Sequence, residues 1–193
     1  MPRALLFDMD GTITEPMLDF PAIKAEMGIG DSPILEALAA MDVDRRSKCE
    51  AILMRHELAA AHASTLNSGC GYLLGWVGQQ RVSTALITRN SALNVRIVVA
   101  KHGLRFDTVV SREDAVPKPS PRPIHLACER LGISAGDAWM IGDGRYDIEA
   151  GVAAGVRTVW ISHGKERLFP TEPWRSVSDL IELRLLLSKQ CLG

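Results

Sequence analysis

The sequence predicts an α/β protein with a mostly parallel sheet covered by helices on both faces, plus an inserted all-helical subdomain. In the later half of the chain, short apolar segments alternate with segments of amphipathic helical pattern. Alternation of this kind is typical of parallel α/β folds. Residues 15–67, which lie between the first and second predicted strands, contain helix signals but no convincing strand. They therefore indicate an insertion into the sheet-forming part of the chain.

Each predicted strand is a run of apolar residues, and the first ends at a glycine turn. In chain order we predict strands over residues 3–8, 84–88, 107–111, 138–143 and 158–162. Crossover helices between parallel strands bring the carboxyl ends of the strands to one edge of the sheet. In such sheets ligands bind outside those ends. Polar residues at the strand ends are therefore the first candidates for a functional site.

The segments between these strands carry helix patterns, in several cases with caps. We predict helices over residues 69–80, 90–103, 120–132, 146–155 and 178–187. The helix 90–103 has Asn90 or Ser91 as its N-cap and Gly103 as its stop, and we expect its buried face to carry Leu93, Ile97 and Ala100. The helix 120–132 has Ser120 as its cap, Pro121 in its first turn, and a face formed by Ile124, Ala127, Cys128 and Leu131.

These elements divide the chain into two predicted parts. Residues 1–14 and 68–193 form the α/β core, and residues 15–67 form the helical insert. Within the insert, Arg45, Arg46 and Lys48 form a basic group that either meets a substrate anion or is a solvated helix face, and the sequence does not decide between the two.

Composition excludes several classes of protein. The chain has 193 residues, 47% hydrophobic, and a formal net charge of −1, which gives no electrostatic case for nucleic acid or an anionic membrane surface. Its four cysteines (Cys49, Cys70, Cys128 and Cys191) are scattered, so neither a metal-binding pair nor a disulfide framework is predicted. We expect no signal peptide and no membrane span, and hence a cytoplasmic protein.

The first predicted strand ends in two carboxylates, Asp8 and Asp10. Side chains two apart in a strand point to the same side, so both can face one site. Two close carboxylates raise each other's proton affinity unless a cation intervenes, so the pair favours a metal site or one protonated partner. One carboxylate can then act as nucleophile and the other as general acid and base. Gly11 allows a sharp turn that brings backbone N–H groups near an anion.

Three further segments supply matching chemistry. Thr88 ends the second strand just before a helix N-terminus, where a hydroxyl suits a phosphate oxygen, and Arg89 beside it borders the same place. Lys118 stands between two prolines that restrict its backbone. Asp143 and Asp147 follow the fourth strand and offer the hard oxygen ligands that Mg²⁺ prefers.

Together these residues resemble the motifs of the haloacid dehalogenase-like superfamily of phosphatases. The D-x-D-G-T run at 8–12, the strand-end Thr88, the downstream Lys118 and the G-D-x-x-x-D run at 142–147 occur in the family's order across most of the chain. The resemblance implies a Rossmann-like, three-layer core and identifies the insert with a small helical cap that closes over the substrate. The nearest analogy is with phosphoglycolate phosphatase-like enzymes.

The resemblance also implies a role for each matching residue. Asp8 becomes the nucleophile that forms an aspartyl-phosphate, and Asp10 the general acid/base. Thr88 and Lys118 bind the transferring phosphoryl group. Asp8, the backbone carbonyl of Asp10 and Asp143 hold Mg²⁺, while Asp147 either supports the metal or orients Lys118.

One position departs from the family pattern. Gly144 stands where the family often has Ser or Thr, which removes a possible hydrogen bond near the metal. The histidines form no predicted ligand cluster, and the four tryptophans are interpreted as packing residues.

The functional hypothesis is a Mg²⁺-dependent phosphatase, an enzyme that hydrolyses a small phosphorylated metabolite as a monomer or homodimer. A phosphomutase and a non-catalytic phosphate- or Mg²⁺-sensing protein are the alternatives. Asp10 argues against the sensor, because a protein that only binds phosphate needs no acid/base group.

Overall fold

The computed structural model describes residues 2–190 and shows two compact units. The smaller unit is the segment Met17–Ser64, and the larger comprises the described residues up to Pro16 and from Thr65 onward. The insert predicted over residues 15–67 thus begins two residues later and ends three residues earlier in the structure. The residues at the two ends of the predicted insert belong to the larger unit, where hydrogen bonds join them. The Glu15 N–H donates to the Thr65 carbonyl (3.0 Å), and the Asn67 N–H donates to the Ile13 carbonyl (3.0 Å).

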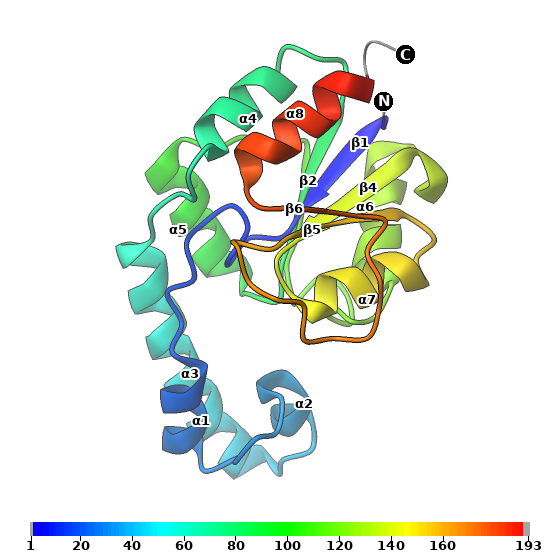
Figure 1. Cartoon of the computed structure of the whole chain (residues 1–193). Helices are drawn as coiled ribbons and strands as arrows, with labels where there is room; N and C mark the ends of the chain where they lie inside the picture. Colours follow the sequence, from blue (N-terminus) through cyan, green and yellow to red (C-terminus); the bar gives the residue numbers. More distant parts are fainter. Residues whose placement is uncertain (1, 191–193) are drawn as a thin grey trace. The chain divides into compact units, whose positions relative to one another are not determined.

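The larger unit is built on a parallel sheet with the strand order β3-β2-β1-β4-β5-β6 (Figure 1). The strands are β1 (Ala4–Phe7), β2 (Ser83–Ile87), β3 (Thr108–Val110), β4 (Ala138–Gly142), β5 (Arg157–Ile161) and β6 (Arg175–Val177). All five neighbouring pairs are parallel. The predicted α/β class is confirmed. The edge strand β6 was not predicted, because Val177 is its only buried residue.

The helices of this unit are α4 (Cys70–Val77), α5 (Ala92–His102), α6 (Arg122–Leu131), α7 (Arg145–Ala153) and α8 (Leu180–Gln190), with a short 3-10 helix at Ala135–Asp137. Alternate strand residues such as Leu6 and Met140 pack with Ile124 of α6 and Ala150 of α7 in one apolar cluster. The residues between them point to the opposite face. There α4 and α8 pack against each other (Figure 1).

Two predicted helix details are wrong. The buried face of α5 carries Asn94, Val95 and Val98, whereas Leu93 is 45% exposed. Helix α6 has Pro121 rather than Ser120 as its N-cap, although the Ser120 hydroxyl accepts a hydrogen bond from the Arg122 N–H (3.2 Å). The predicted cap of α5 is resolved as Ser91, whose side chain accepts from the Asn94 N–H.

The smaller unit contains α1 (Phe20–Met27), α2 (Ile34–Ala39) and α3 (Val43–Ala63) around its own apolar cluster. The Arg46 guanidinium donates to the Leu38 and Ala39 carbonyls at the end of α2 (2.9 and 3.0 Å). Arg45 donates to the carbonyl of Gly28, the residue that ends α1 (3.2 Å). These two arginines therefore satisfy helix C-termini, a role that neither sequence hypothesis included.

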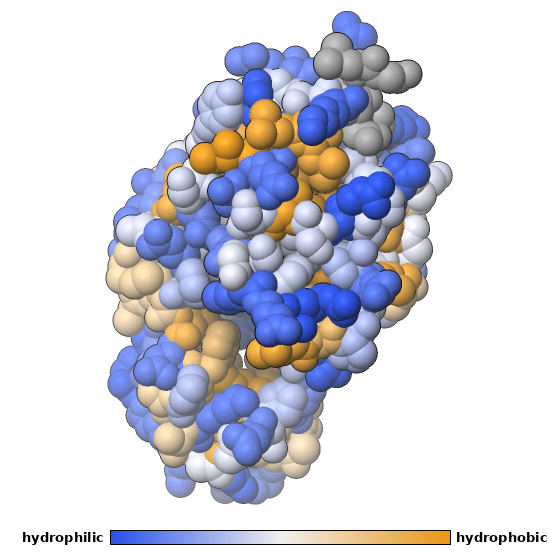
Figure 2. Space-filling view, in the orientation of Figure 1, coloured by the Kyte–Doolittle hydropathy of each residue, from blue (hydrophilic) through white to orange (hydrophobic). Residues whose placement is uncertain are grey.

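Apolar side chains gather on the surface over α4 and α8 (Figure 2), where Ile181 and Leu185 are exposed. Within residues 2–190, no helix combines the length and the apolar character needed to cross a membrane. Of the cysteines, Cys49, Cys70 and Cys128 are buried free thiols, and Cys191 lies outside the described residues.

Two glycines in helices provide a test of how tightly α7 packs on the sheet. A Cβ at Gly151 would lie 2.3 Å from Thr158 Cγ2, whereas a Cβ at Gly75 in α4 would meet nothing within 4 Å. Gly151→Ala should lower the free energy of unfolding by about 1–3 kcal/mol because it overpacks the core. The matched Gly75→Ala should raise it by up to about 1 kcal/mol through helix propensity. Urea unfolding measures both, and a Gly151→Ala protein as stable as the wild type would contradict the packing.

Candidate active site

The sequence-predicted site residues meet at the carboxyl edge of the sheet. Asp8 directly follows β1, Thr88 follows β2 and Asp143 follows β4, and these three strands are neighbours with β1 in the middle. The chain crosses from β1 to β2 on one side and reaches β4 on the other. The site therefore lies where the strand order reverses, which is the usual ligand position in open parallel sheets.

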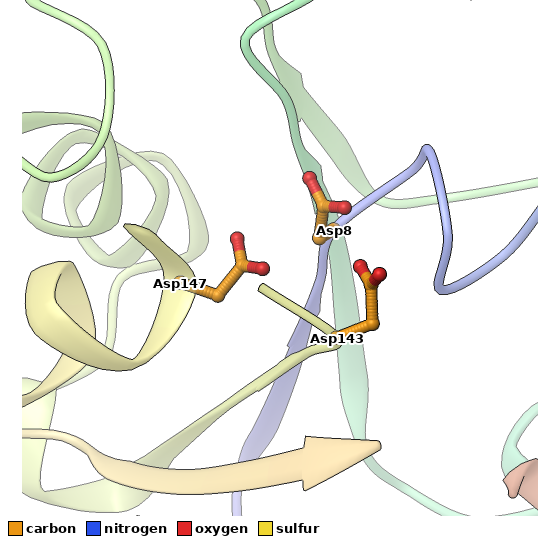
Figure 3. Close-up of side chains that lie close together, drawn as sticks. All are labelled: Asp8, Asp143 and Asp147. Atoms are coloured by element: carbon orange, nitrogen blue, oxygen red, sulfur yellow. The ribbon is translucent and has the colours of Figure 1, made fainter. Parts of the chain in front are cut away.

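Three carboxylates converge at this edge (Figure 3). Asp8, Asp143 and Asp147 each place an oxygen within 4.8 Å of the others, and Asp8 and Asp147 are buried. Asp147 belongs to the first turn of α7, so β1, β4 and α7 each bring one carboxylate to the cluster. The side chain of Asp10 is not part of this group.

Lys118 is the counter-charge of the cluster. Its side chain is 2% exposed, and its ammonium donates to Asp8 Oδ1 (2.5 Å), Asp147 Oδ1 (2.5 Å) and the Ile87 carbonyl (2.8 Å). Burial alone would lower the pKa of Lys118, but the charges of Asp147 and Asp8 outweigh it and raise that pKa above its ordinary value. The lysine therefore stays charged, and its three donors are all used.

One ammonium does not neutralise three carboxylates. Burial, together with the negative charge of Asp147, raises the pKa of Asp8 well above its ordinary value, although Lys118 opposes the shift. The same two causes raise the pKa of Asp143 to about 6. The cluster thus has excess negative charge and offers hard oxygen donors, and a divalent cation such as Mg²⁺ fits it.

Asp10 lies in a different environment. Its Oδ2 accepts a hydrogen bond from Asn90 Nδ2 (3.1 Å), and Asn90 Oδ1 in turn accepts from Asn94 Nδ2 (2.9 Å). Burial raises the pKa of Asp10, and the bond from Asn90 partly opposes this. Two carboxylates two residues apart are therefore held by different partners, an ammonium for Asp8 and an amide for Asp10.

The turn after Asp10 requires a glycine. Gly11 has φ 91°, and a Cβ on it would lie 2.3 Å from Asp143 Oδ2. The Gly11 N–H donates to the Thr14 carbonyl (2.8 Å), and the N–H groups of Thr12, Ile13 and Thr14 all donate to the Met9 carbonyl. The sequence predicts that this turn brings backbone N–H groups near an anion, whereas the N–H groups of residues 11–14 form hydrogen bonds inside the turn.

Thr88 and Arg89 occupy the end of β2. The buried Thr88 hydroxyl accepts from the Asn90 N–H (3.0 Å). Arg89 donates to the Lys118 carbonyl, and its guanidinium lies 4.4 Å from the centre of the Tyr146 ring. Arg89 thus links the segments that carry Thr88, Lys118 and Asp147.

The atypical Gly144 begins α7 as its N-cap. Its N–H donates to Asp147 Oδ2 (3.0 Å), and a Cβ at this position would lie 3.3 Å from the same oxygen. Asp147 therefore both caps α7 and holds Lys118. These bonds agree with the orienting role that was one of its two predicted functions.

Three residues of the site were not predicted from the sequence. Asn67, assigned to the insert, donates to backbone carbonyls of the turn 11–14. His163, in the loop after β5, is half-buried and donates to the Gly11 carbonyl. Trp160 donates through Nε1 to the Asp143 carbonyl (2.8 Å). All three bind main-chain oxygens, which carry no residue-type pattern in the sequence.

The chain is similar to known hydrolases in its family, in its sequence and in its fold. Residues 21–161 match the family described as haloacid dehalogenase-like hydrolase. The chain is 31% identical to a phosphoglycolate phosphatase of Pectobacterium atrosepticum over 84% of this chain and 81% of that protein, and 27% identical to pyrophosphatase PpaX of Bacillus velezensis over 93% and 95%. A hydrolase structure from Pseudomonas syringae shares the fold, with TM-score 0.82, 17% identity, and 97% and 98% of the two chains covered.

The charge excess predicts a stability gain from neutralising Asp143. Its pKa rises from the ordinary 3.8 to about 6 in the folded protein, so the folded state binds the proton more tightly and loses stability as the pH rises through this interval. Asp143→Asn cannot ionise. In EDTA at pH 7.5 the free energy of unfolding of this variant should therefore be on the order of 1–3 kcal/mol higher than that of the wild type.

At pH 4 this advantage should largely disappear, because the wild-type carboxyl is then mostly protonated. Asp137→Asn is the matched control, since Asp137 is exposed and its carboxylate forms a long ion pair with the exposed Arg3 (3.8 Å). This substitution should change stability by less than about 0.5 kcal/mol. A gain of the same size at pH 4 and pH 7.5, or a loss at pH 7.5, would refute the charge excess.

Proposed function

Because the chain belongs to the haloacid dehalogenase-like hydrolase family, we propose that it is a Mg²⁺-dependent phosphatase that hydrolyses small phosphomonoesters through a phosphorylated Asp8. The observation that carries the proposal is the unequal environment of the two carboxylates. Asp8 is paired with the buried Lys118, and Asp10 is hydrogen-bonded to an uncharged amide. Such a difference suits one nucleophile and one proton carrier.

In the first step, a carboxylate oxygen of Asp8 attacks phosphorus and the bond between phosphorus and the substrate oxygen breaks. The bond from Lys118 to Asp8 Oδ1 restricts rotation of the carboxylate and so keeps it oriented for attack. The same ammonium attracts the negative oxygens of the transferring group. Asp10 gives its proton to the departing oxygen, and its raised pKa increases the protonated fraction available for this.

In the second step, a water molecule attacks the phosphorus of the aspartyl-phosphate. Asp10, now ionised, takes a proton from that water, and the bond between phosphorus and Asp8 breaks to release inorganic phosphate. The Asn90 amide holds Asp10 through both steps, since it donates to either form of the carboxyl group. Thr88, at the end of the neighbouring strand, is assigned to the phosphate oxygens.

We assign the Mg²⁺ site to Asp8, Asp143 and the backbone carbonyl of Asp10. We assign Asp147 the role of orienting Lys118, from which it accepts a hydrogen bond. When bound, the cation neutralises negative charge on the phosphate oxygens and on the carboxylate cluster. Trp160 and Thr12 hold Asp143 for this role, through its carbonyl and its carboxylate respectively.

The unit Met17–Ser64 is proposed as a small cap that selects the substrate. The relatives named phosphoglycolate phosphatase and pyrophosphatase make small phosphorylated metabolites the class to test first. The buried free thiols of Cys49, Cys70 and Cys128 suit a reducing compartment, and a cytoplasmic location is proposed on that ground.

The proposal predicts distinct losses for the two carboxylates. With p-nitrophenyl phosphate, phosphoglycolate, pyrophosphate and sugar phosphates as substrates, Asp8→Asn and EDTA should each abolish measurable phosphate release. Asp10→Asn should lower kcat by about 10²–10⁴-fold on alkyl phosphates, the range typical of general acid/base groups. Far-UV circular dichroism and thermal unfolding should show both variants folded.

Two results would contradict the mechanism. Undiminished phosphate release by Asp8→Asn would exclude it as the nucleophile. A wild-type protein that hydrolyses no substrate on the panel, with Mg²⁺ present, would exclude the phosphatase.

A further inference from the structure

The carbonyl of Gly11, next to the proton carrier Asp10, accepts hydrogen bonds from two side chains that are remote in sequence. Asn67 Nδ2 lies 2.9 Å from it and His163 Nε2 lies 2.7 Å from it. Asn67 precedes α4, the helix that leads into β2, and His163 follows β5. Since β2 and β5 lie on opposite sides of β1 in the sheet order, the two donors come from segments attached to opposite halves of the sheet. Neither residue belongs to the set that matches the family motifs.

The amide nitrogen of Asn67 is suited to this place because three backbone carbonyls lie within hydrogen-bond distance of it. Besides Gly11, its Nδ2 lies 2.9 Å from the Thr12 carbonyl and 2.9 Å from the Thr14 carbonyl. An amide nitrogen has two hydrogens, so the three acceptors share them. A side chain that presents an acceptor here would be repelled by all three oxygens.

His163 is held in an unusual backbone conformation while it makes its bond. Its φ is 49°, the left-handed region that non-glycine residues rarely adopt, and its N–H donates to the Ser178 carbonyl (3.0 Å). Since a carbonyl only accepts, Nε2 must carry the hydrogen. Both the neutral Nε2–H tautomer and the charged ring satisfy this, so the bond does not depend on ionisation of the ring.

We infer that Asn67 and His163 are positioning residues that fix the Asp10–Gly11–Thr12 turn and thereby aim Asp10 at the leaving group; this inference rests on the proposed phosphatase function. Fixing the Gly11 carbonyl from two sides fixes the peptide plane that follows it. Thr12, which donates to Asp143 Oδ1 (3.3 Å), is oriented by the same plane. A misplaced acid group is costly, since an error of about 1 Å can lower a rate about 100-fold.

The test separates positioning of Asp10 from general damage by varying the leaving group. p-Nitrophenolate departs readily as the anion, whereas the alkoxide of an alkyl phosphate must be protonated as it leaves. In the first step, poor aim of Asp10 should therefore slow alkyl phosphates selectively, while a loosened fold should slow both substrates together. Because the second step is the same for both substrates and also uses Asp10, the first step is measured separately, as release of the alcohol or phenol in a single turnover with enzyme in excess.

Four variants should be compared with the wild type on glycerol phosphate and p-nitrophenyl phosphate at saturating Mg²⁺, with Asp10→Asn as reference. His163→Asn tolerates the left-handed backbone but is too short to reach Gly11. His163→Gln restores reach with an amide donor. Asn67→Ser replaces the two amide N–H donors with one hydroxyl on a shorter side chain and adds no charge. His125→Gln is the matched control, because His125 Nε2 lies 3.4 Å from the Ala154 carbonyl in α6–α7 packing outside the site.

His163→Asn and Asn67→Ser should each lower the single-turnover rate constant of glycerol release from glycerol phosphate about 10–100-fold, with the half-saturating enzyme concentration unchanged and p-nitrophenol release within about threefold of wild type. Asp10→Asn should show the same selectivity, His163→Gln should recover most of the lost rate, and His125→Gln should behave as wild type. Equal losses on both substrates, or no loss on either, in an active wild-type background would overturn the inference. An inactive wild type would instead overturn the proposed function beneath it.

Discussion

The buried ammonium of Lys118 is the interaction on which the rest of the site depends. A buried charge is stable only when it is paired and hydrogen-bonded, and removing one partner of such a group typically costs several kcal/mol. Lys118 meets this requirement with Asp8 after β1, Asp147 in α7 and the last carbonyl of β2. The sheet order, which places β1 between β2 and β4, is what brings these partners within reach of one side chain.

That same order explains how two neighbouring aspartates acquire different chemistry. Asp8 directly follows the last residue of β1, and its carboxylate belongs to the cluster with Asp143 and Asp147. Asp10 has already entered the turn, where the amide of Asn90 reaches it from the start of α5. The turn can be this tight because Gly11 adopts φ 91° and leaves space for Asp143. The different environments of the two carboxylates thus follow from a change of backbone direction over two residues.

Much of the core could be predicted because buried parallel strands are short apolar runs and their ends meet at one edge. Features with no such pattern could not. Strand β6 buries only Val177, so its apolar content did not identify it as a strand. Helix α5 was predicted, but it is apolar on several faces and its buried face includes the polar Asn94, so periodicity did not identify that face. Asn67 and His163 contact backbone oxygens of the turn, and any segment of the chain has such oxygens.

The insert Met17–Ser64 is joined to the larger unit close to the turn that follows Asp10, but the turn itself belongs to the larger unit. The chain leaves the larger unit at Pro16 and returns to it at Thr65. The outgoing and returning segments are joined by the Glu15–Thr65 hydrogen bond and by an isolated β-bridge between Thr14 and Leu66. Asn67 then adds its bonds to the turn itself. The described residues that hydrogen-bond to Asp10 and to the Gly11 carbonyl, which are Asn90, Asn67 and His163, all belong to the larger unit. If Met17–Ser64 selects the substrate as proposed, its sequence and length can change without changing the residues that hold Asp10.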